Sequence, residues 1–191
     1  MASSGPNYPG TGTFIDDPSD TNWTNASNIT ADDGSNATSA TGGETDVLLG
    51  TAFGFAIDSG ATIDGIVLEI DRGNTAGDPC KDQEVRLTTG GTPLGDNKAD
   101  TASDWPTSVT TKTYGGAADT WGRTWTPAEV NASDFGARLL AARSSGKSTA
   151  TAAVDFFRIT VYYTAAGGGD PEGRLKGGKL IRGGLLRGGV L

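Results

Sequence analysis

The sequence predicts an all-β protein, an antiparallel β-sandwich of the jelly-roll or immunoglobulin-like kind. Short segments in which apolar and polar residues alternate recur along the chain, and turn-forming residues separate them. No long window shows the periodicity of an amphipathic helix. Seven or eight short strands of this type fit one sandwich domain, which we place at residues 22–164.

The N-terminal segment, residues 1–21, differs in composition from the predicted domain. It is rich in Gly, Pro, Ser and Asp, and its residues suited to burial are Tyr8, Phe14 and Ile15. Such a composition is typical of an extended arm and not of a folded element. We therefore expect this arm to lie outside the sandwich, where it is free to dock on a neighbour.

The first half of the domain contains four strand candidates. They are residues 38–41, 46–55, 61–71 and 84–88. In the third candidate Ile66, Leu68 and Ile70 occupy every second position, so one face of that strand is buried. The glycine-containing stretch 73–79 predicts a loop, after which the fourth candidate is expected to form a hairpin.

The second half contains four more strand candidates and one helical turn. The strands are expected at residues 109–114, 120–125, 135–141 and 153–164. The last has apolar residues on both sides, which predicts a central strand. Between the second and third, Thr126 and Glu129 have the spacing of a capping box with Pro127 at the first helical position, which predicts one helical turn at 127–132.

Charge is distributed unevenly along the chain. The net charge is −8, from 15 basic and 23 acidic residues. No acid follows Glu172, whereas five basic residues do, so the preceding part carries 10 − 23 = −13 and the end of the chain +5. An acidic body repels phosphate groups, so we expect no nucleic-acid partner.

The residues that support catalysis or metal binding are scarce. Histidine is absent, and Cys80 is the single cysteine, which excludes an intrachain disulfide. No nucleophile motif or phosphate loop occurs, so we expect neither an enzyme nor a cofactor. Acidic turns such as Asp16–Asp17 offer oxygen ligands for Ca²⁺, but they lack the spacing of an EF-hand loop and are explained by turn chemistry.

The C-terminal part divides into a linker and a tail. Residues 165–173, rich in Ala and Gly, predict a flexible linker, and residues 174–191 combine glycine pairs with aliphatic and basic residues. A short segment cannot bury its own leucines, so we expect it to dock on protein or to form oligomers, a disordered basic end being the alternative. No wide apolar helix face is present, so we expect no membrane contact. The expected docking residues are Leu175, Leu180, Ile181, Arg182, Leu185, Leu186, Arg187, Val190 and Leu191.

Four tryptophans are the largest side chains of the chain, and two interpretations of them remain open. Core packing is favoured because large aliphatic residues are few. In the alternative, Trp105, Trp121 and Trp125 stack on the rings of a sugar, and the last two share one face of the predicted strand 120–125. Under this alternative the protein binds a glycan.

Five segments carry a resemblance to a known family. In chain order they read TNWTNASNITADDGSNAT, FGFAIDSGATIDGIVLEIDR, VRLTTGGTPLGDNKA, TYGGAADTWGRTWTPAEVNASDFG and VDFFRITVYYT. Over residues 22–164 the chain resembles a β-sandwich domain of tailed-bacteriophage virion proteins. The resemblance implies a sandwich without catalytic residues, used as a head decoration, a head or neck fibre or a tail appendage. It does not explain the Cys80 loop or the glycine-rich tail.

The residues and the resemblance together predict a bacteriophage virion structural protein. A terminal segment would anchor it to capsid, neck or tail proteins or to sister subunits, and we expect a homo-oligomer, a trimer by analogy with other phage appendages. The N-terminus has no signal-peptide pattern, so we expect synthesis in the host bacterial cytoplasm and incorporation into the virion. The alternative is an appendage module that recognises a bacterial surface glycan.

Overall fold

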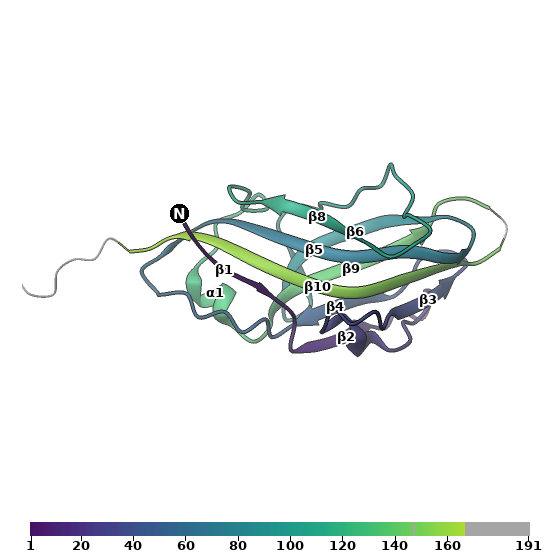
Figure 1. Cartoon of the computed structure of the whole chain (residues 1–191), viewed down its shortest axis with the longest axis horizontal. Helices are drawn as coiled ribbons and strands as arrows, with labels where there is room; N and C mark the ends of the chain where they lie inside the picture. Colours follow the sequence, from purple (N-terminus) through teal and green to yellow (C-terminus); the bar gives the residue numbers. More distant parts are fainter. Residues whose placement is uncertain (147, 167–191) are drawn as a thin grey trace, which may run out of the picture.

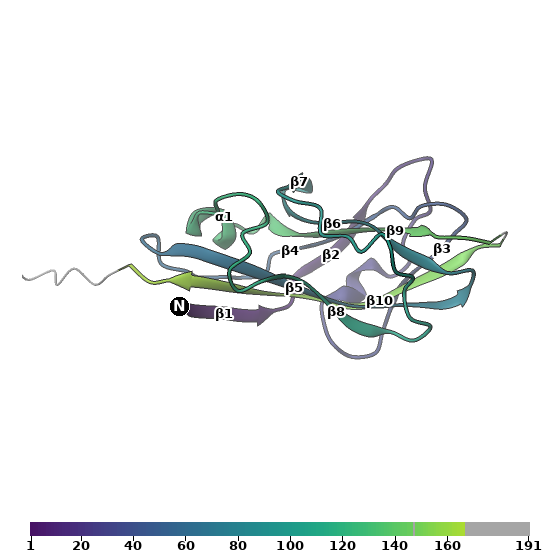
Figure 2. The same ribbon diagram turned by 90° about the horizontal axis from the view of Figure 1, so that it is seen from above.

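The computed structural model describes residues 1–146 and 148–166 as two antiparallel β-sheets packed face to face (Figures 1 and 2). The all-β sandwich prediction is confirmed. Within this part of the chain no helix is long and apolar enough to span a membrane. The predicted tail 174–191, and the predicted linker beyond Ala166, lie outside the described residues.

Each sheet has five strands. The first sheet contains β1 (Ala2–Asn7), β10 (Ala150–Thr164), β5 (Thr62–Gly77) and β8 (Thr110–Gly116) in that order, and β3 (Ala37–Thr41) also pairs with β10. The second sheet contains β2 (Thr11–Ile15), β4 (Val47–Thr51), β9 (Phe135–Arg143), β6 (Cys80–Thr89) and β7 (Thr92–Leu94) in that order. β10 is central, as its two apolar sides predict, because β5 lies on one edge and both β1 and β3 lie on the other.

The connections identify the sandwich as a jelly roll. From β3 onward, consecutive strands pass from one sheet to the other, with the β6–β7 hairpin as the exception. The strand orders β3-β10-β5-β8 and β4-β9-β6-β7 follow from these crossings. Two interlocked Greek keys of this kind define the jelly roll, which decides between the two sandwich types that the sequence predicted.

The N-terminal segment is part of the sandwich, so the prediction of a separate arm at residues 1–21 is wrong. β1 pairs antiparallel with β10, with Ala2 opposite Tyr163, and β2 pairs antiparallel with β4, with Ile15 opposite Val47. The segment thus adds one strand to each sheet. Its small polar residues misled the prediction because an edge strand needs few large apolar side chains.

Three further predictions are corrected. Residues 120–125 form no strand but a turn in which Trp121 has a φ of 57°. The predicted loop at 73–79 is mostly strand, because β5 continues to Gly77 and pairs there with Ala150. The segment that follows forms no hairpin with β5: the chain crosses to the other sheet at residues 78–79, and β6 pairs with β9 and β7.

The predicted helical turn is present as α1 (Pro127–Asn131), and a short 3₁₀ helix, η1 (Ala26–Ile29), was not predicted. In α1 the Thr126 side chain accepts a hydrogen bond from the Glu129 amide at 3.2 Å, and the Glu129 carboxylate accepts one from the Thr126 amide at 2.8 Å. The capping box satisfies helix amides that have no partner within the helix.

The core lies between the two inner faces. Its fully buried members include Ile66, Leu68 and Ile70 of β5, Phe157, Ile159 and Val161 of β10, Val85 and Leu87 of β6, and Phe135, Ala137, Leu139 and Ala141 of β9. The four β9 residues are those that the alternation placed on one face. Burying each large aliphatic or aromatic side chain contributes about 1.5–3 kcal/mol, so these faces hold the sheets together.

The two chain ends leave the sandwich at the same end. Ala2 lies opposite Tyr163 in the β1–β10 pair, so the N-terminus and the exit of β10 are neighbours, as Figure 1 shows. The start of β10 at Ala150, which pairs with Thr41 at the end of β3 and with Gly77 at the end of β5, lies at the other end. The domain therefore has one end at which the chain enters β1 and leaves β10, and an opposite end away from both points.

Candidate functional site

All four tryptophans are buried in the core cluster. Each ring nitrogen donates a hydrogen bond inside the domain. Trp23 donates to the Asp46 carbonyl at 2.7 Å, Trp105 to the Asp82 carboxylate at 2.7 Å, Trp121 to the Ile66 carbonyl at 2.9 Å and Trp125 to the Thr120 carbonyl at 2.9 Å. With covered ring faces they do not stack on a sugar. The alternative prediction that Trp105, Trp121 and Trp125 contact a glycan is therefore wrong. These side chains fill the core, where large aliphatic residues are few.

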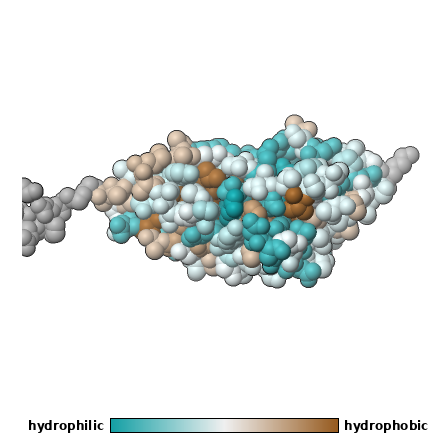
Figure 3. Space-filling view, in the orientation of Figure 1, coloured by the Kyte–Doolittle hydropathy of each residue, from teal (hydrophilic) through white to brown (hydrophobic). Residues whose placement is uncertain are grey.

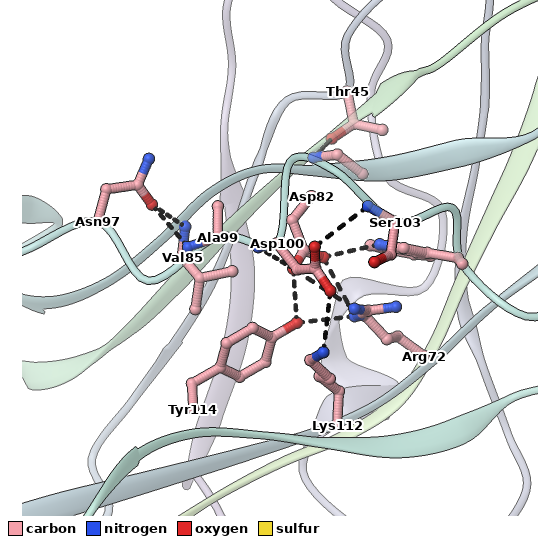
Figure 4. Close-up of polar contacts among 12 residues, drawn as sticks. Thr45, Arg72, Asp82, Val85, Asn97, Ala99, Asp100, Ser103, Lys112 and Tyr114 are labelled. Atoms are coloured by element: carbon pink, nitrogen blue, oxygen red, sulfur yellow. Dashed lines mark hydrogen bonds and ion pairs between the residues drawn. The ribbon is translucent and has the colours of Figure 1, made fainter.

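A buried polar cluster joins the two sheets beneath the loop 95–109 (Figure 4). Arg72 on β5 and Tyr114 on β8 come from the first sheet, and Asp82 on β6 comes from the second. The Arg72 Nε atom lies 3.1 Å from the Asp82 carboxylate and donates to the Tyr114 hydroxyl at 2.7 Å. The hydroxyl in turn donates to Asp82 at 2.9 Å, and the Arg72 guanidinium lies 4.8 Å from the Trp105 ring centroid.

The Asp82 carboxylate of this cluster is fully occupied. Besides Arg72 and Tyr114 it accepts hydrogen bonds from Trp105 and from the Asp100 amide, and it is completely buried. Burial, with the nearby Asp82 charge, raises the pKa of the Tyr114 hydroxyl. Burial likewise raises the pKa of the neighbouring Cys80 thiol to about 12. Groups so enclosed do not reach a substrate, so the cluster acts on the fold and holds the loop in place.

The loop 95–109 has further attachments. The Asn97 side chain accepts from the Val85 amide at 2.9 Å, and Lys112 lies 3.0 Å from the Asp100 carboxylate. Hydrogen bonds from Lys112 and Ser103 lower the pKa of Asp100 to about 2. Long segments without regular structure in a compact domain are usually functional or mobile. Here an ion pair and hydrogen bonds attach the segment to β6 and β8.

The outer face of the first sheet is uncovered and polar. Arg158 on β10 binds Glu69 on β5 through two hydrogen bonds of 2.8 and 3.1 Å, and half-buried Tyr162 points to the same side of β10. Tyr8 packs edge-on against Phe156, with ring centroids 5.7 Å apart. Figure 3 shows this face as mainly hydrophilic or neutral, with small isolated apolar spots. This face was not predicted as a candidate surface, although the alternation in the closing strand places Arg158 and Tyr162 on one side of it.

The outer face of the second sheet carries a small apolar patch, which we call the Ile15 patch. It consists of Ile15 on β2, Val47 and Leu49 on β4 and Leu140 on β9. Ile15 and Val47 are opposite one another, and Ile15 is 40% exposed. In the described part of the chain, Met1 is the other large hydrophobic residue with this much exposure. Asp16 and Asp17 follow Ile15 directly, and Asp20 comes three residues after Asp17.

The remaining predicted positions divide by location. The docking residues expected in the tail, Leu175 to Leu191, lie outside the described residues. The acidic turns are described, and within residues 1–146 and 148–166 no group of three or more Cys, Asp or Glu side chains converges closely enough to hold a metal ion. The Asp17 carboxylate instead accepts hydrogen bonds from the amide and the hydroxyl of Ser19, at 3.0 and 2.8 Å.

Comparison with known proteins adds little to this description. No family model matches the chain, and no curated protein matches it. The fold is similar to a solved structure, the second N-terminal cellulose-binding domain from Cellulomonas fimi β-1,4-glucanase C. That similarity has a TM-score of 0.44 with 14% sequence identity, over 83% of this chain and 94% of the other. At this level the likeness says nothing of what this chain binds.

Proposed function

We propose that this protein is a non-catalytic structural component of a tailed-bacteriophage virion, anchored through a terminal segment to other virion proteins or to sister subunits. The observation that carries the proposal is the separation of the chain into an acidic sandwich of charge −13, counted to Glu172, and a following segment of charge +5 with leucines and no core of its own. A segment of that composition binds another surface.

The arrangement of the termini supports this proposal. The start of β1 and the exit of β10 lie at one end of the domain, so anchoring there projects the opposite end away from the particle (Figure 1). Among the described residues, Asp82 is buried and hydrogen-bonded and Cys80 is buried, so neither side chain is open to a substrate. A domain of this kind is suited to a decoration or a fibre, and the resemblance over residues 22–164 points to the same use.

The experiment is to delete residues 174–191 and to measure incorporation into particles by co-sedimentation. We expect a folded sandwich that no longer joins particles. A matched control replaces the same segment by a Gly-Ser sequence of equal length, which separates the loss of specific side chains from the loss of chain length. Normal incorporation of the truncated protein would overturn terminal anchoring by the tail.

A second candidate function, recognition of a bacterial surface glycan, is favoured by the outer face of the first sheet. That face is mainly polar and carries Tyr162 on the same side of β10 as Arg158, four residues along the strand, so aromatic and charged groups are available to a saccharide. The tryptophans take no part. The Tyr162→Ala variant should lose retardation in gels containing host polysaccharide, whereas Thr113→Ala on β8, which β5 separates from β10, should not. Absence of retardation for the unmodified protein would remove this candidate.

A further inference from the structure

The Ile15 patch combines an apolar centre with an acidic border. Val47 and Leu49 are each 8% exposed, whereas Ile15 is 40% exposed. The turn at Gly91 lies against Ile15 and Leu49. Asp16 and Asp17 are exposed beside it. The border lies in the most acidic part of the chain, because residues 1–71 contain 11 acidic residues and no Lys or Arg. A partner with apolar and basic side chains would match it.

The acidic border has no basic partner among the described residues. None of the ion pairs in residues 1–146 and 148–166 involves Asp16, Asp17, Asp20 or Asp46. Asp46 is nearly completely buried, and one of its carboxylate oxygens has no hydrogen-bond partner there. Burial, with the charges of Asp17 and Asp46, raises the pKa of Asp20. Carboxylates gathered in this way favour a cation nearby.

The chain itself contains a segment with the required chemistry. Residues 174–191 place Lys or Arg next to aliphatic residues, as in Lys179-Leu180-Ile181-Arg182, and carry no acidic side chain. Leucine side chains would cover Ile15, and the neighbouring basic groups would reach the carboxylates of Asp16 and Asp17. Opposite charges arranged around an apolar contact select the partner and its orientation.

The position of the patch favours the tail of a second copy. The tail leaves the first sheet beyond Thr164, at the end of the domain that holds β1. The patch is on the second sheet, and Leu140 lies near the end of β9, which leads through the loop 144–149 to the start of β10. That is the opposite end of the domain. A chain's own tail would have to return along the sandwich, whereas a copy placed head to tail presents its tail directly.

We propose that residues 174–191 of one copy dock on the Ile15 patch of the next copy, with leucines on Ile15 and Leu140 and basic side chains on Asp16, Asp17 and Asp20. The inference rests on the proposed function in that the tail is its docking segment, and it names the partner as a second copy of this chain. The contact joins two different surfaces, so it repeats from copy to copy into a closed ring, of which a reciprocally exchanged pair is the smallest, or into a filament.

The test uses the full chain with a photo-crosslinking residue, Leu180→p-benzoylphenylalanine, in an equal mixture of ¹⁴N- and ¹⁵N-labelled protein. We expect crosslinks from position 180 to residues 11–22 or 47–51, and we expect them in mixed-isotope pairs. Crosslinks that join only like isotopes would show that the tail binds its own chain, and crosslinks elsewhere on the sandwich, or none, would also overturn the proposal.

Two variants check that the patch and the charges act as proposed. The Ile15→Ser, Asp16→Asn, Asp17→Asn variant should lower the crosslink yield by about tenfold, the effect of removing one apolar anchor. The Asp64→Asn, Asp71→Asn variant on the first sheet is the matched control and should retain the yield. If the patch variant unfolds, Lys179→Glu with Arg182→Glu tests the same contact from the tail, and an unchanged yield would refute it.

The docking of the tail on a second copy and the anchoring of the tail to the virion can fail independently of one another. Crosslinks to another virion protein, in place of a second copy, would leave terminal anchoring intact and defeat this inference. Normal particle incorporation after deletion of residues 174–191 would instead defeat tail anchoring, while the crosslinks of the purified chain would still report on self-association.

Discussion

Replacing Arg72 by Met should be among the most damaging single changes in this domain. Arg72 and Asp82 are both buried, with Nε 3.1 Å from the carboxylate, and they join the two sheets. In the Arg72→Met variant the Asp82 charge keeps only uncharged donors: the Trp105 ring, the Tyr114 hydroxyl and the Asp100 amide. Leaving a buried charge without its partner costs about 3–5 kcal/mol.

That cost is a large share of the stability of an ordinary domain, about 5–15 kcal/mol. With a urea m-value of about 2 kcal/mol/M, a loss of about 4 kcal/mol lowers the unfolding midpoint by about 2 M. Urea unfolding followed by tryptophan fluorescence measures this shift directly, because all four tryptophans are buried in the core. An unchanged m-value would show that the variant alters stability and not the extent of unfolding.

Two matched variants make this prediction refutable. Arg158→Met removes an ion pair with Glu69 that is partly open to solvent, so it should cost below about 1 kcal/mol. Adding Asp82→Asn to Arg72→Met removes the uncompensated charge, so the double variant should be more stable than the sum of the single losses predicts. If Arg72→Met costs no more than Arg158→Met, or if the losses simply add, Arg72 does not stabilise the fold by compensating the buried Asp82 charge.

Further predictions concern single positions. The Cys80 thiol, whose pKa burial raises to about 12, should resist iodoacetamide at pH 8.5 until the protein is unfolded in urea. Because that folded pKa exceeds the unfolded value, its stabilisation is complete below about pH 9 and falls as pH rises toward 12; in alkaline melts Cys80→Ala should lessen the fall. Gly95→Ala should cost at least about 2 kcal/mol in urea unfolding, because Gly95 has a φ of 68° and its new methyl group would meet the Trp121 carbonyl, whereas Gly42→Ala, in open space, should cost well under 1 kcal/mol. Thr126→Ala should cost about 1 kcal/mol by removing the cap of α1, and an unchanged melting temperature would contradict that role.

Structural features that depend on residues close together in the sequence were predictable. The alternation of Ile66, Leu68 and Ile70 identified a half-buried strand because successive side chains of a strand point to opposite faces. The capping box at Thr126 and Glu129 identified a helical turn because its hydrogen bonds join residues three apart. Each signal depends on contacts within a few residues, so no knowledge of distant segments was needed.

The failures concern contacts between distant segments. Residues 2–7 become a strand by pairing with β10, more than 150 positions later in the chain, and nothing in their own composition announces that partner. The segment 120–125 has residues suited to a strand, yet Trp121 enters the core from a turn at positive φ and donates to Ile66. In both places tertiary contacts outweigh local preference.

The candidate surfaces show the same division. The sequence alone established the sandwich class, the acidic body, the basic tail and the absence of histidine, because these follow from composition and local alternation. Only the tertiary structure decided that the tryptophans are covered, that Arg72 meets Asp82 between the sheets, and that Ile15 is exposed beside a row of carboxylates. Exposure and pairing depend on which strands lie side by side, and that pairing is chosen by the packing of the whole chain.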